Sequence, residues 1–304
     1  MNNIEKKLLA DIADLHSVPQ GSYNIRKNGK SVDRVSTADV EIVNKTDRDG
    51  IDIIVKPGVK NRSVHIPVIV TESGIKDMVY NDFYIGDNAE VLIVAGCGVH
   101  TTGDVESGHD GMHTFHIGKG AKIKYVEKHI GSGSNAKKTL NPITNIHMKE
   151  DSEFEMETIQ IGGVTYSNRA TNAKLKANAK LSIKEKVLTT DTDTAITKFK
   201  VELLGDGSSV NVISRSVAKD NSTQKFVSKI VGKANCFGHV ECDGIILDHA
   251  RIVSTPEVDA VNVNASLVHE AAIGKIAGEQ MTKLMSLGLS EAEAEDMIIK
   301  GYLN

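Results

Sequence analysis

The sequence predicts a repetitive, mainly β fold in which short strands stack in successive coils, as a β-helix or as a pair of stacked sheets. Aromatic residues make up 4% of the chain and Trp is absent, beside 26 Gly and 5 Pro, which predicts a thin core of aliphatic side chains. A short phrase returns six times at intervals of 26 to 32 residues, within the range of solenoid repeats. Inside each phrase, apolar and polar residues alternate with the period of two that marks a β-strand with one buried face.

Composition limits the classes of partner and compartment. The 304 residues carry 36 basic and 40 acidic side chains, a net charge of −4, without a long Lys/Arg run, so neither a nucleic-acid surface nor an anionic-membrane anchor is expected. No segment approaches the roughly 18 apolar residues of a membrane span. Three Cys cannot build a disulfide framework and suit a reducing compartment, which makes the cytoplasm the expected location.

Residues 1–35 are predicted to form an N-terminal helical segment. The run MNNIEKKLLADIADLH places Ile4, Leu8, Ile12 and Leu15 among charged residues. This spacing is typical of an amphipathic helix and not of the apolar stretch of a secretory leader. Export is therefore not expected.

Residues 36–268 are predicted to form the repeating core. Each phrase starts with a Gly or charged turn, continues with a small residue and then alternates, as in GKGAKIKYV from Gly118. A strand that cannot bury its apolar face alone gains stability by stacking on the next coil. Regular strand spacing also fits an antiparallel sandwich, which is the alternative. The six small residues are Ala89, Ala121, Ser152, Ala179, Ser208 and Ala234.

Residues 269–304 are predicted to form a C-terminal helical pair. Apolar residues recur at mostly helical intervals from Ile273, Gly288 is placed to cap the first helix, and Gly301 is placed to end the second. Ser290 and Glu293 have the spacing of a capping box. The pair either closes the end of the solenoid or, with Met side chains left over, forms a docking surface.

Common enzyme signatures are absent from the sequence. The stretch GSGSNAKKT from Gly131 lacks the Gly directly before Lys-Ser/Thr that a phosphate-binding P-loop requires. The chain also has no Gly-x-Ser-x-Gly elbow, no His-Glu-x-x-His and no Cys-x-x-Cys. We therefore expect no nucleotide site in this chain.

One stretch, NCFGHVECDGIILDH, is dense in potential metal ligands. Thiolate, imidazole and carboxylate are the protein ligands of iron and zinc. On an unbroken strand, however, the two Cys face one side while His239 and Glu241 face the other, so one ion could be shared only if Gly238 formed a bulge. The alternative is that the Cys are small buried hydrophobic residues. The potential ligands are Cys236, His239, Glu241, Cys242, Asp243, Asp248 and His249.

A second group comprises Cys97, in AGCGVHT, and the histidines His109, His113 and His116. Spacings of four and three would form a metal-binding face on a helix, but the following residues have the pattern of a strand. A surface or packing role is therefore favoured over a metal site for these histidines.

The run GHVECDGIILDHARIVSTPEV and the later run LVHEAAIGKIAGEQMTKLMSLGLSEAEAEDMIIKGYL resemble the carboxy-terminal core of the B/D scaffold subunits of the SUF iron-sulfur cluster assembly system. AGCGVHT and GKGAKIKYVE are similar to the earlier core of that family. The resemblance therefore covers about residues 40–304 and is strongest over the last 75.

The resemblance implies a right-handed parallel β-helix core, a C-terminal helical segment that docks an ABC-type ATPase, and a dimer formed through the core, here a homodimer. It implies a scaffold for cluster assembly without an ATPase site of its own. The iron-sulfur cluster would be held transiently, with a sulfur donor and recipient apoproteins as further partners.

By matching position, His269 is the family's site histidine, with Glu270 beside it. Because thiolates are the soft ligands of a cluster, we expect Cys242 to be the principal ligand, with His269 and Glu241 completing the metal ligands. His239 is expected to assist, and Cys236 is either a second ligand or a core filler. Two chains paired across a two-fold axis would supply two copies of this set.

The sequence departs from the family in two respects. The larger bacterial subunits carry an essential Cys a few residues after the Glu-Cys-Asp phrase, where this chain has Ala250, and they have a long amino-terminal region that this chain mostly lacks. The chain therefore resembles a minimal single-scaffold form. Ala250 also permits a cluster-free structural subunit that only docks the ATPase. A carbohydrate-active β-helix is disfavoured, because aromatic platforms and a secretory leader are missing.

Overall fold

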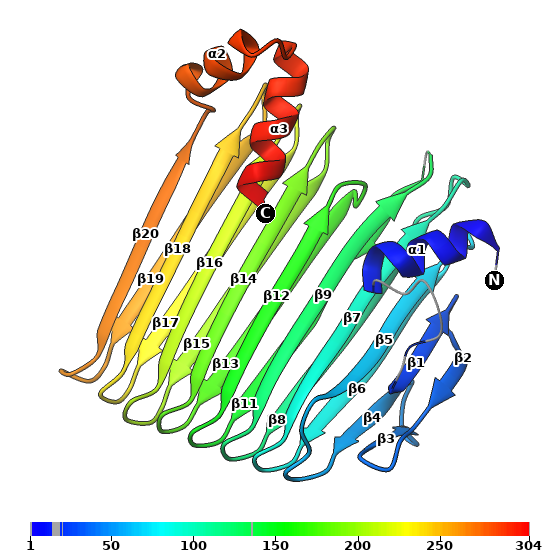
Figure 1. Cartoon of the computed structure of the whole chain (residues 1–304), viewed down its shortest axis with the longest axis vertical. Coiled ribbons are helices and arrows are strands. Elements are labelled where there is room, and N and C mark those ends of the chain that lie inside the picture. Colours follow the sequence, from blue (N-terminus) through cyan, green and yellow to red (C-terminus); the bar gives the residue numbers. More distant parts are fainter. Residues whose placement is uncertain (1, 14–18, 20, 135, 304) are drawn as a thin grey trace.

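A computed structural model describes residues 2–13, 19, 21–134 and 136–303. The chain is a mainly β, parallel β-solenoid of about eight turns, with a helix at its N-terminal end and two at its C-terminal end (Figure 1). The predicted mainly β solenoid is thereby confirmed, and the antiparallel sandwich was wrong for this chain. The helices are α1 (Asn3–Ala13), α2 (Gly278–Ser286) and α3 (Glu291–Leu303).

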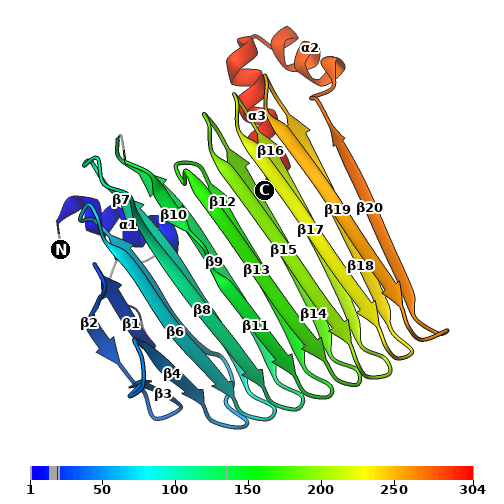
Figure 2. The ribbon, with the colours of Figure 1, turned by 180° about the vertical axis from the view of Figure 1, so that it is seen from behind.

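Two ten-stranded sheets face each other, and the chain passes from one to the other with every strand from β5 onward, counting β10 and β11 as one interrupted strand (Figure 2). Sheet A contains, in spatial order, β2 (Lys30–Val35), β1 (Ser22–Lys27), β5 (Arg62–Val70), β7 (Glu90–His100), β9 (Lys122–Ser132), β12 (Glu153–Ile161), β14 (Lys180–Thr189), β16 (Ser209–Ala218), β18 (Phe237–Ile246) and β20 (Ser266–Gly274). Sheet B contains β19 (Arg251–Ala260), β17 (Thr223–Gly232), β15 (Thr194–Leu203), β13 (Tyr166–Leu175), β10 (Lys138–Leu140) with β11 (Ile143–Met148), β8 (Ser107–Ile117), β6 (Lys76–Ile85), β4 (Gly50–Val55) and β3 (Val40–Asn44).

The turns from sheet B to sheet A explain the repeated phrase. The turns before β7, β9, β12, β14 and β16 each contain one residue with a positive φ. This residue is Asn, Asp or Gly, as at Asn88 (57°), Asp151 (60°) and Asn178 (56°), because these residues adopt the left-handed conformation most readily. The next residue is small and buried, since it lies where the coils stack closely. In the last phrase this position belongs to Cys236 and not to the predicted Ala234, because Cys236 directly precedes β18 in register with Ser208.

The core lies between the two sheets and is formed by alternate residues of nearly every strand. It is largely aliphatic, as predicted, but the few aromatic residues are concentrated in it. Phe83 and Phe115 stack with ring centroids 4.3 Å apart, and Tyr125 and Phe154 each meet Phe115 edge-on. The scarcity of rings thus does not make the core purely aliphatic.

The N-terminal segment is only partly helical. Helix α1 packs Leu8 and Ile12 on the outer face of sheet A, over β5, β7 and β9. Gly96 and Gly98 allow α1 to approach the sheet closely, because they have no side chain. A Cβ on Gly96 would lie 2.8 Å from the Ile12 backbone oxygen. Leu15 lies outside the described residues. Within residues 1–35 the structure also has the β1–β2 hairpin, since Asn28-Gly29, both with positive φ, form a tight two-residue turn.

The C-terminal segment starts with a strand. Residues 266–274 pair with β18 as β20, so the expected helical pattern from residue 269 was wrong up to Gly274. The capping box is confirmed: the Ser290 backbone N–H donates to Glu293 Oε2 over 2.9 Å, and the Glu293 N–H donates to Ser290 Oγ. Gly288, with a φ of 99°, follows α2 as predicted, whereas Gly301 lies inside α3. Among the described residues, no helix has the length and apolar character to span a membrane.

Candidate functional site

Strand β18 carries four of the potential ligands and runs without a bulge. It pairs with β16 and β20 in unbroken register, from Phe237 opposite Ser209 to Ile246 opposite Ala218. Gly238 therefore does not bend the strand. Because side chains alternate along a straight strand, Cys242 points between the sheets while His239 and Glu241 lie on the outer face of sheet A.

The Cys242 thiol is fully buried, with 0% of the residue exposed. Burial raises its pKa to about 11, and the nearby Ser254 hydroxyl opposes that shift. The thiol is therefore protonated at neutral pH in the single chain. Cys236 is also buried and belongs to the same core cluster, with its sulfur against Gly232.

His269 is on β20, directly beside Val240 in the ladder, and so faces the same interior side as Cys242. Both ring nitrogens are buried, and neither has a hydrogen-bond partner in the described part of the chain. Burial, followed by the proximity of His239, lowers the pKa of the imidazole. A neutral imidazole with two unsatisfied nitrogens is a ligand or proton acceptor without a partner.

The remaining three residues form a row on the outer face. Glu241 and Glu270 are neighbours in the ladder, and His239 Nε2 lies 3.9 Å from Glu270 Oε2. His239 Nδ1 is 2.9 Å from the Asn211 side-chain oxygen. Since Glu270 is mostly exposed, this ion pair is weak.

The sheet thus divides the six predicted residues into two groups of three. Cys236, Cys242 and His269 lie on the inner side, and His239, Glu241 and Glu270 lie on the outer side. Within residues 2–13, 19, 21–134 and 136–303, no three His, Cys, Asp or Glu side chains are arranged to hold a metal ion. Besides Cys236, one chain therefore offers the Cys242 thiol and the His269 imidazole on the inner side, and carboxylates across the backbone from them.

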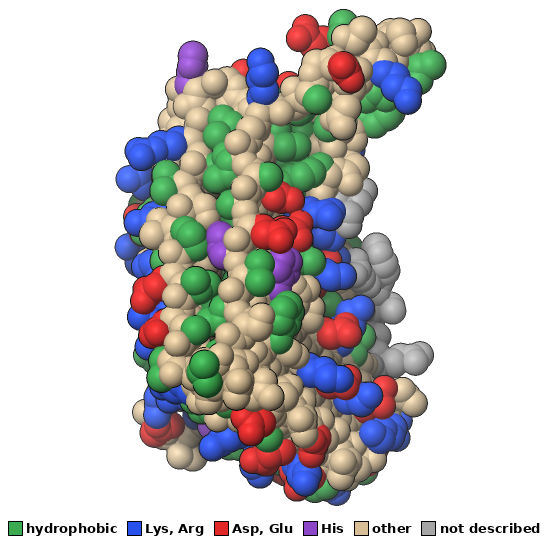
Figure 3. All heavy atoms as spheres, turned by 90° about the vertical axis from the view of Figure 1, so that its left-hand side faces the viewer, with side chains coloured by type: hydrophobic (Ala, Val, Ile, Leu, Met, Phe, Trp, Pro, Cys, Tyr) green, Lys and Arg blue, Asp and Glu red, His purple; other side chains and the backbone are tan. Residues whose placement is uncertain are grey.

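Cys242 and His269 lie at the open end of the solenoid. Strands β19 and β20 are the last of their sheets, and each has one edge without a neighbouring strand. Figure 3 faces this end and shows hydrophobic side chains spread over it, with acidic and His side chains among them. Five of the exposed hydrophobic residues at this end are Phe237, Val258, Val261, Val263 and Ile273, of which Val263 is 96% exposed.

A buried polar cluster in the first half of the solenoid was not predicted from the sequence. Arg169 Nη1 donates to Glu127 Oε2 over 2.6 Å, and Arg169 Nη2 lies 3.2 Å from His129 Nδ1. Burial acts to raise the pKa of Glu127, but Arg169 and His129 hold it well below its usual range. The alternation along β9 could have indicated this cluster, because Glu127 and His129 occupy the same inward-facing positions of the alternating pattern as Ile123 and Tyr125.

The polar interior continues along one row of sheet A towards Cys242. Glu127, Thr158, Glu185, Ser214 and Cys242 are successive neighbours in the ladder, all on the inner side. Burial raises the pKa of the Glu185 carboxyl, which accepts hydrogen bonds of 2.9 Å from Thr197 and Ser214. Cys242 therefore ends a row in which polar groups interrupt the apolar core.

The histidines of β8 serve different roles on the two faces of their strand. His109 and His113 point inward, where His109 Nδ1 lies 3.1 Å from Asp77 and His113 Nδ1 lies 2.9 Å from the Tyr125 hydroxyl. Burial lowers the pKa of His113 to about 4. His116 points outward and stacks on Tyr84. Packing and surface roles, the favoured interpretation, account for all three.

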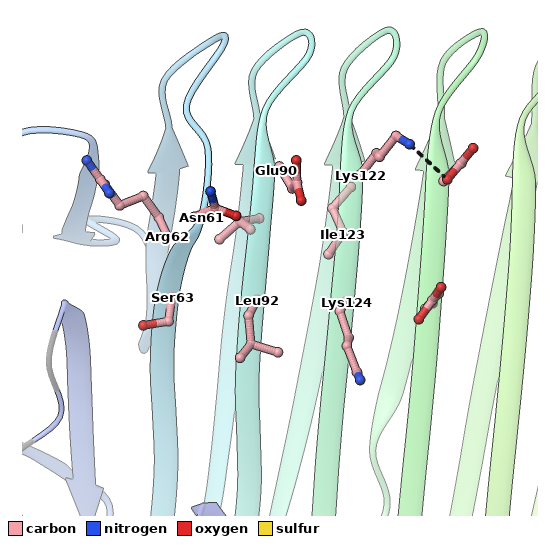
Figure 4. A pocket seen from close by; sticks show the side chains of 11 residues that line it. Asn61, Arg62, Ser63, Glu90, Leu92, Lys122, Ile123 and Lys124 are labelled. Atoms are coloured by element: carbon pink, nitrogen blue, oxygen red, sulfur yellow. Dashed lines mark ion pairs between the residues drawn. The ribbon is translucent and has the colours of Figure 1, made fainter.

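A groove of about 440 Å³ crosses the outer face of sheet A near its first coils (Figure 4). Charges of alternating sign line it and pair along the rungs, as Lys122 does with Glu153 at 3.5 Å and Lys60 with Glu90 at 3.7 Å. Its lining contains neither Cys nor His. The groove is separate from the candidate site and has the character of a solvated charged surface.

Comparison with known proteins gives a consistent result. Residues 76–302 match the family model described as SUF system FeS cluster assembly, SufBD core domain. Iron-sulfur cluster assembly SufBD family proteins of Methanothermobacter thermautotrophicus (strain Winter) and Archaeoglobus fulgidus are each 30% identical to the chain, over 78% and 88% of its length. These matches cover 58% and 70% of the two relatives, so the chain spans less than two thirds of the first. The iron-sulfur cluster assembly protein SufB of Bacillus subtilis is 35% identical over 33% of this chain and 22% of its own length.

Proposed function

Because the chain belongs to the SufBD family of iron-sulfur cluster assembly proteins, we propose that it is a scaffold that holds a nascent cluster at the open end of its solenoid. The observation that supports this most is His269, whose buried ring nitrogens have no partner among the described residues and which shares the inner side with the Cys242 thiol. A soft sulfur ligand with a weaker nitrogen ligand suits a cluster that must later leave. The scaffold has no ATPase site of its own.

The cluster is cargo in this proposal, and a second chain completes its site. One chain supplies a single Cys242 thiol, whereas two chains related by a two-fold axis supply two. The thiol must lose its proton to bind iron, and its raised pKa means that binding requires a change in its surroundings or direct displacement of the proton by the metal. Cluster binding would be assisted from the outer face by Glu241, Glu270 and His239.

A homodimer formed through the end of the solenoid is supported by its exposed edges. An unpaired strand edge is a template for pairing with another chain, and both sheets end in one. The hydrophobic side chains over this end, Val261 and Val263 among them, would be covered by the second copy. This arrangement brings the two inner sites towards one interface.

The C-terminal helices are the proposed docking segment for an ABC-type ATPase partner. Helix α3 is anchored, because Ile299 and Leu303 pack with Val217 on the outer face of sheet A. Helix α2 buries none of its residues and projects beyond the strands (Figure 1). Met285 in α2 and Leu287 directly after it are exposed, and such flexible apolar side chains suit a protein interface. Residues 269–274 of the predicted docking segment belong to β20.

The proposed setting is the cytoplasm, where a sulfur donor and recipient apoproteins complete the process. All three cysteines are free thiols, which suits a reducing compartment. A cluster-free subunit that only docks the ATPase is the second candidate function. It is favoured by Ala250 and by the protonated state of the Cys242 thiol, whose pKa is raised by burial.

Anaerobic reconstitution of the full chain with iron and sulfide, with and without the ATPase, tests the proposal. We expect a charge-transfer absorption band with stoichiometric iron, lost in Cys242→Ala and weakened in His269→Ala. Cys236→Ala is the matched control, since it removes a buried thiol at a packing position; it should retain the band. A chain that binds the ATPase but yields no band under either condition would instead be the cluster-free subunit. An unchanged band in Cys242→Ala would refute the assignment of the ligand.

A further inference from the structure

The N-terminal end of the solenoid holds a cavity of about 350 Å³ that the assembly function does not use. It lies between the hairpin β1–β2 of sheet A and the hairpin β3–β4 of sheet B. Its lining includes Ile66, Val79 and Asn81, which point between the sheets. The cavity is therefore the mouth of the interior at the end opposite to Cys242.

Most charges around this cavity are paired. Arg26 makes two hydrogen bonds of 2.7 Å with Asp77, and Lys45 contacts both Asp52 and Asp82. Arg48, at the rim, pairs with its neighbour Asp47. These cations are therefore neutralised, and the second carboxylate beside Lys45 leaves an excess negative charge near that residue.

Arg34 is an exception, and Lys30 is a second one. The Arg34 guanidinium is partly buried, and no carboxylate in the described part of the chain pairs with it. Its Nε donates to the Asn24 side-chain oxygen over 2.8 Å, and its Nη2 lies 3.4 Å from Ser31 Oγ. Burial without a counter-charge lowers the pKa of this guanidinium. A guanidinium has five N–H donors, so at least half of them remain for a ligand.

A β-bulge places Arg34 in the cavity. Asn24 pairs with Arg34 and Arg26 pairs with Ser31, so β2 has one residue more than β1 between these pairs. Without this extra residue, Ser31 and Arg34 would point to opposite faces; with it, both face Asn24. Lys30, directly after the tight Asn28-Gly29 turn, also lines the cavity and has no acidic partner among the described residues. Among the described residues of the lining, Asp49 is the one acidic residue, so an anion would bind on the β2 side.

We propose that this cavity binds a small oxyanion of the phosphate class through Arg34 and Lys30. The planar fork of a guanidinium matches two oxygens of such an anion, and an ammonium adds a point charge. The anion would supply the counter-charge that Arg34 lacks. This site is independent of the cluster site and does not rest on the proposed function.

Titration of the full chain with inorganic phosphate at low salt, followed by calorimetry and by NMR of the β1–β2 amides, tests the site. We expect saturable binding that becomes roughly tenfold or more weaker in Arg34→Gln, because a charged donor contributes on the order of 1.5 kcal/mol or more. Arg62→Gln, an exposed arginine paired with Asp39 outside the cavity, is the matched control and should bind as the parent does.

Two further variants distinguish a loss of phosphate binding from a loss of folding. Lys30→Gln changes an exposed side chain and leaves the fold intact, and it should weaken binding even if Arg34→Gln proves unstable. Arg34→Lys, which keeps the charge but loses the fork, should bind more weakly than the parent. Absence of saturable phosphate binding to the parent chain, or equal affinity of parent, Arg34→Gln and Lys30→Gln, would overturn the assignment.

Discussion

Replacing Arg169 by Leu should destabilise the solenoid by about 3–5 kcal/mol, because it removes the buried cation beside Glu127 and leaves that carboxylate with only the His129 imidazole as a partner. Both side chains are almost fully buried, 6% and 3% exposed, and their closest atoms are 2.6 Å apart. The same substitution removes the donor to His129. Since whole domains are stable by about 5–15 kcal/mol, the loss is large. Urea unfolding at pH 7, followed by far-UV circular dichroism, measures it.

The pH dependence of the stability loss in Arg169→Leu shows whether the buried Glu127 charge causes it. With Arg169 present, the depressed pKa of Glu127 contributes stability above the unfolded value of 4.5, and this contribution is lost as the pH falls through the folded pKa. In Arg169→Leu burial raises the pKa instead, so Glu127 takes up a proton on acidification and the buried charge disappears. The difference between parent and variant should therefore narrow as the pH falls from 7 towards 5.

A double variant and a surface control complete the test. Arg169→Leu with Glu127→Leu removes both charges and should recover about half of the lost stability, with the unpaired His129 accounting for the rest. Arg62→Leu, which breaks an exposed ion pair, should cost less than about 1 kcal/mol. A loss below 1 kcal/mol in Arg169→Leu, or a double variant less stable than the single one, would refute the reasoning.

Three other substitutions test different parts of the fold. Gly96→Val should cost about 1–3 kcal/mol and speed proteolysis of α1, because the new side chain meets backbone oxygens of α1 and β9, whereas Gly274→Ala, in open space, should be neutral. Ser290→Ala removes the capping box and should lower the stability of α3 by about 1 kcal/mol, measured by amide hydrogen exchange at the first turn. Burial raises the pKa of the Glu185 carboxyl, so ionisation of this group lowers the stability of the fold as the pH rises above 4.5. Glu185→Gln should therefore raise the midpoint of urea unfolding more at pH 8 than at pH 4. An equal increase at both pH values would contradict this prediction.

The sequence predicted the solenoid because two independent periods agree. The alternation within strands sets the inner and outer faces, and the turn phrase sets the length of a coil. The boundary at residue 269 could not be predicted in the same way. Strand β20 has a neighbour on one side only, and most of its residues are exposed on both faces, so its sequence lacks the alternation of an internal strand.

The polar interior escaped prediction for a related reason. A polar residue at an alternating position is read as outward-facing, yet Glu127 and Glu185 occupy inward positions and depend on partners from other coils. Arg169 is 42 residues from Glu127, and no local pattern connects them. Such pairs become visible only when the coils are stacked.

The division of the candidate ligands follows from the strand that carries them. Because β18 is straight and internal, its residues alternate between the core and the outer face, and no rotation of a side chain brings Cys242 and Glu241 to the same side of the backbone. His269 reaches the inner side only because β20 pairs with β18 in a register that places it beside Val240. A shift of one residue would move this imidazole to the outer face, next to Glu241. The register of the last strand therefore decides which ligand set the open end of the solenoid presents.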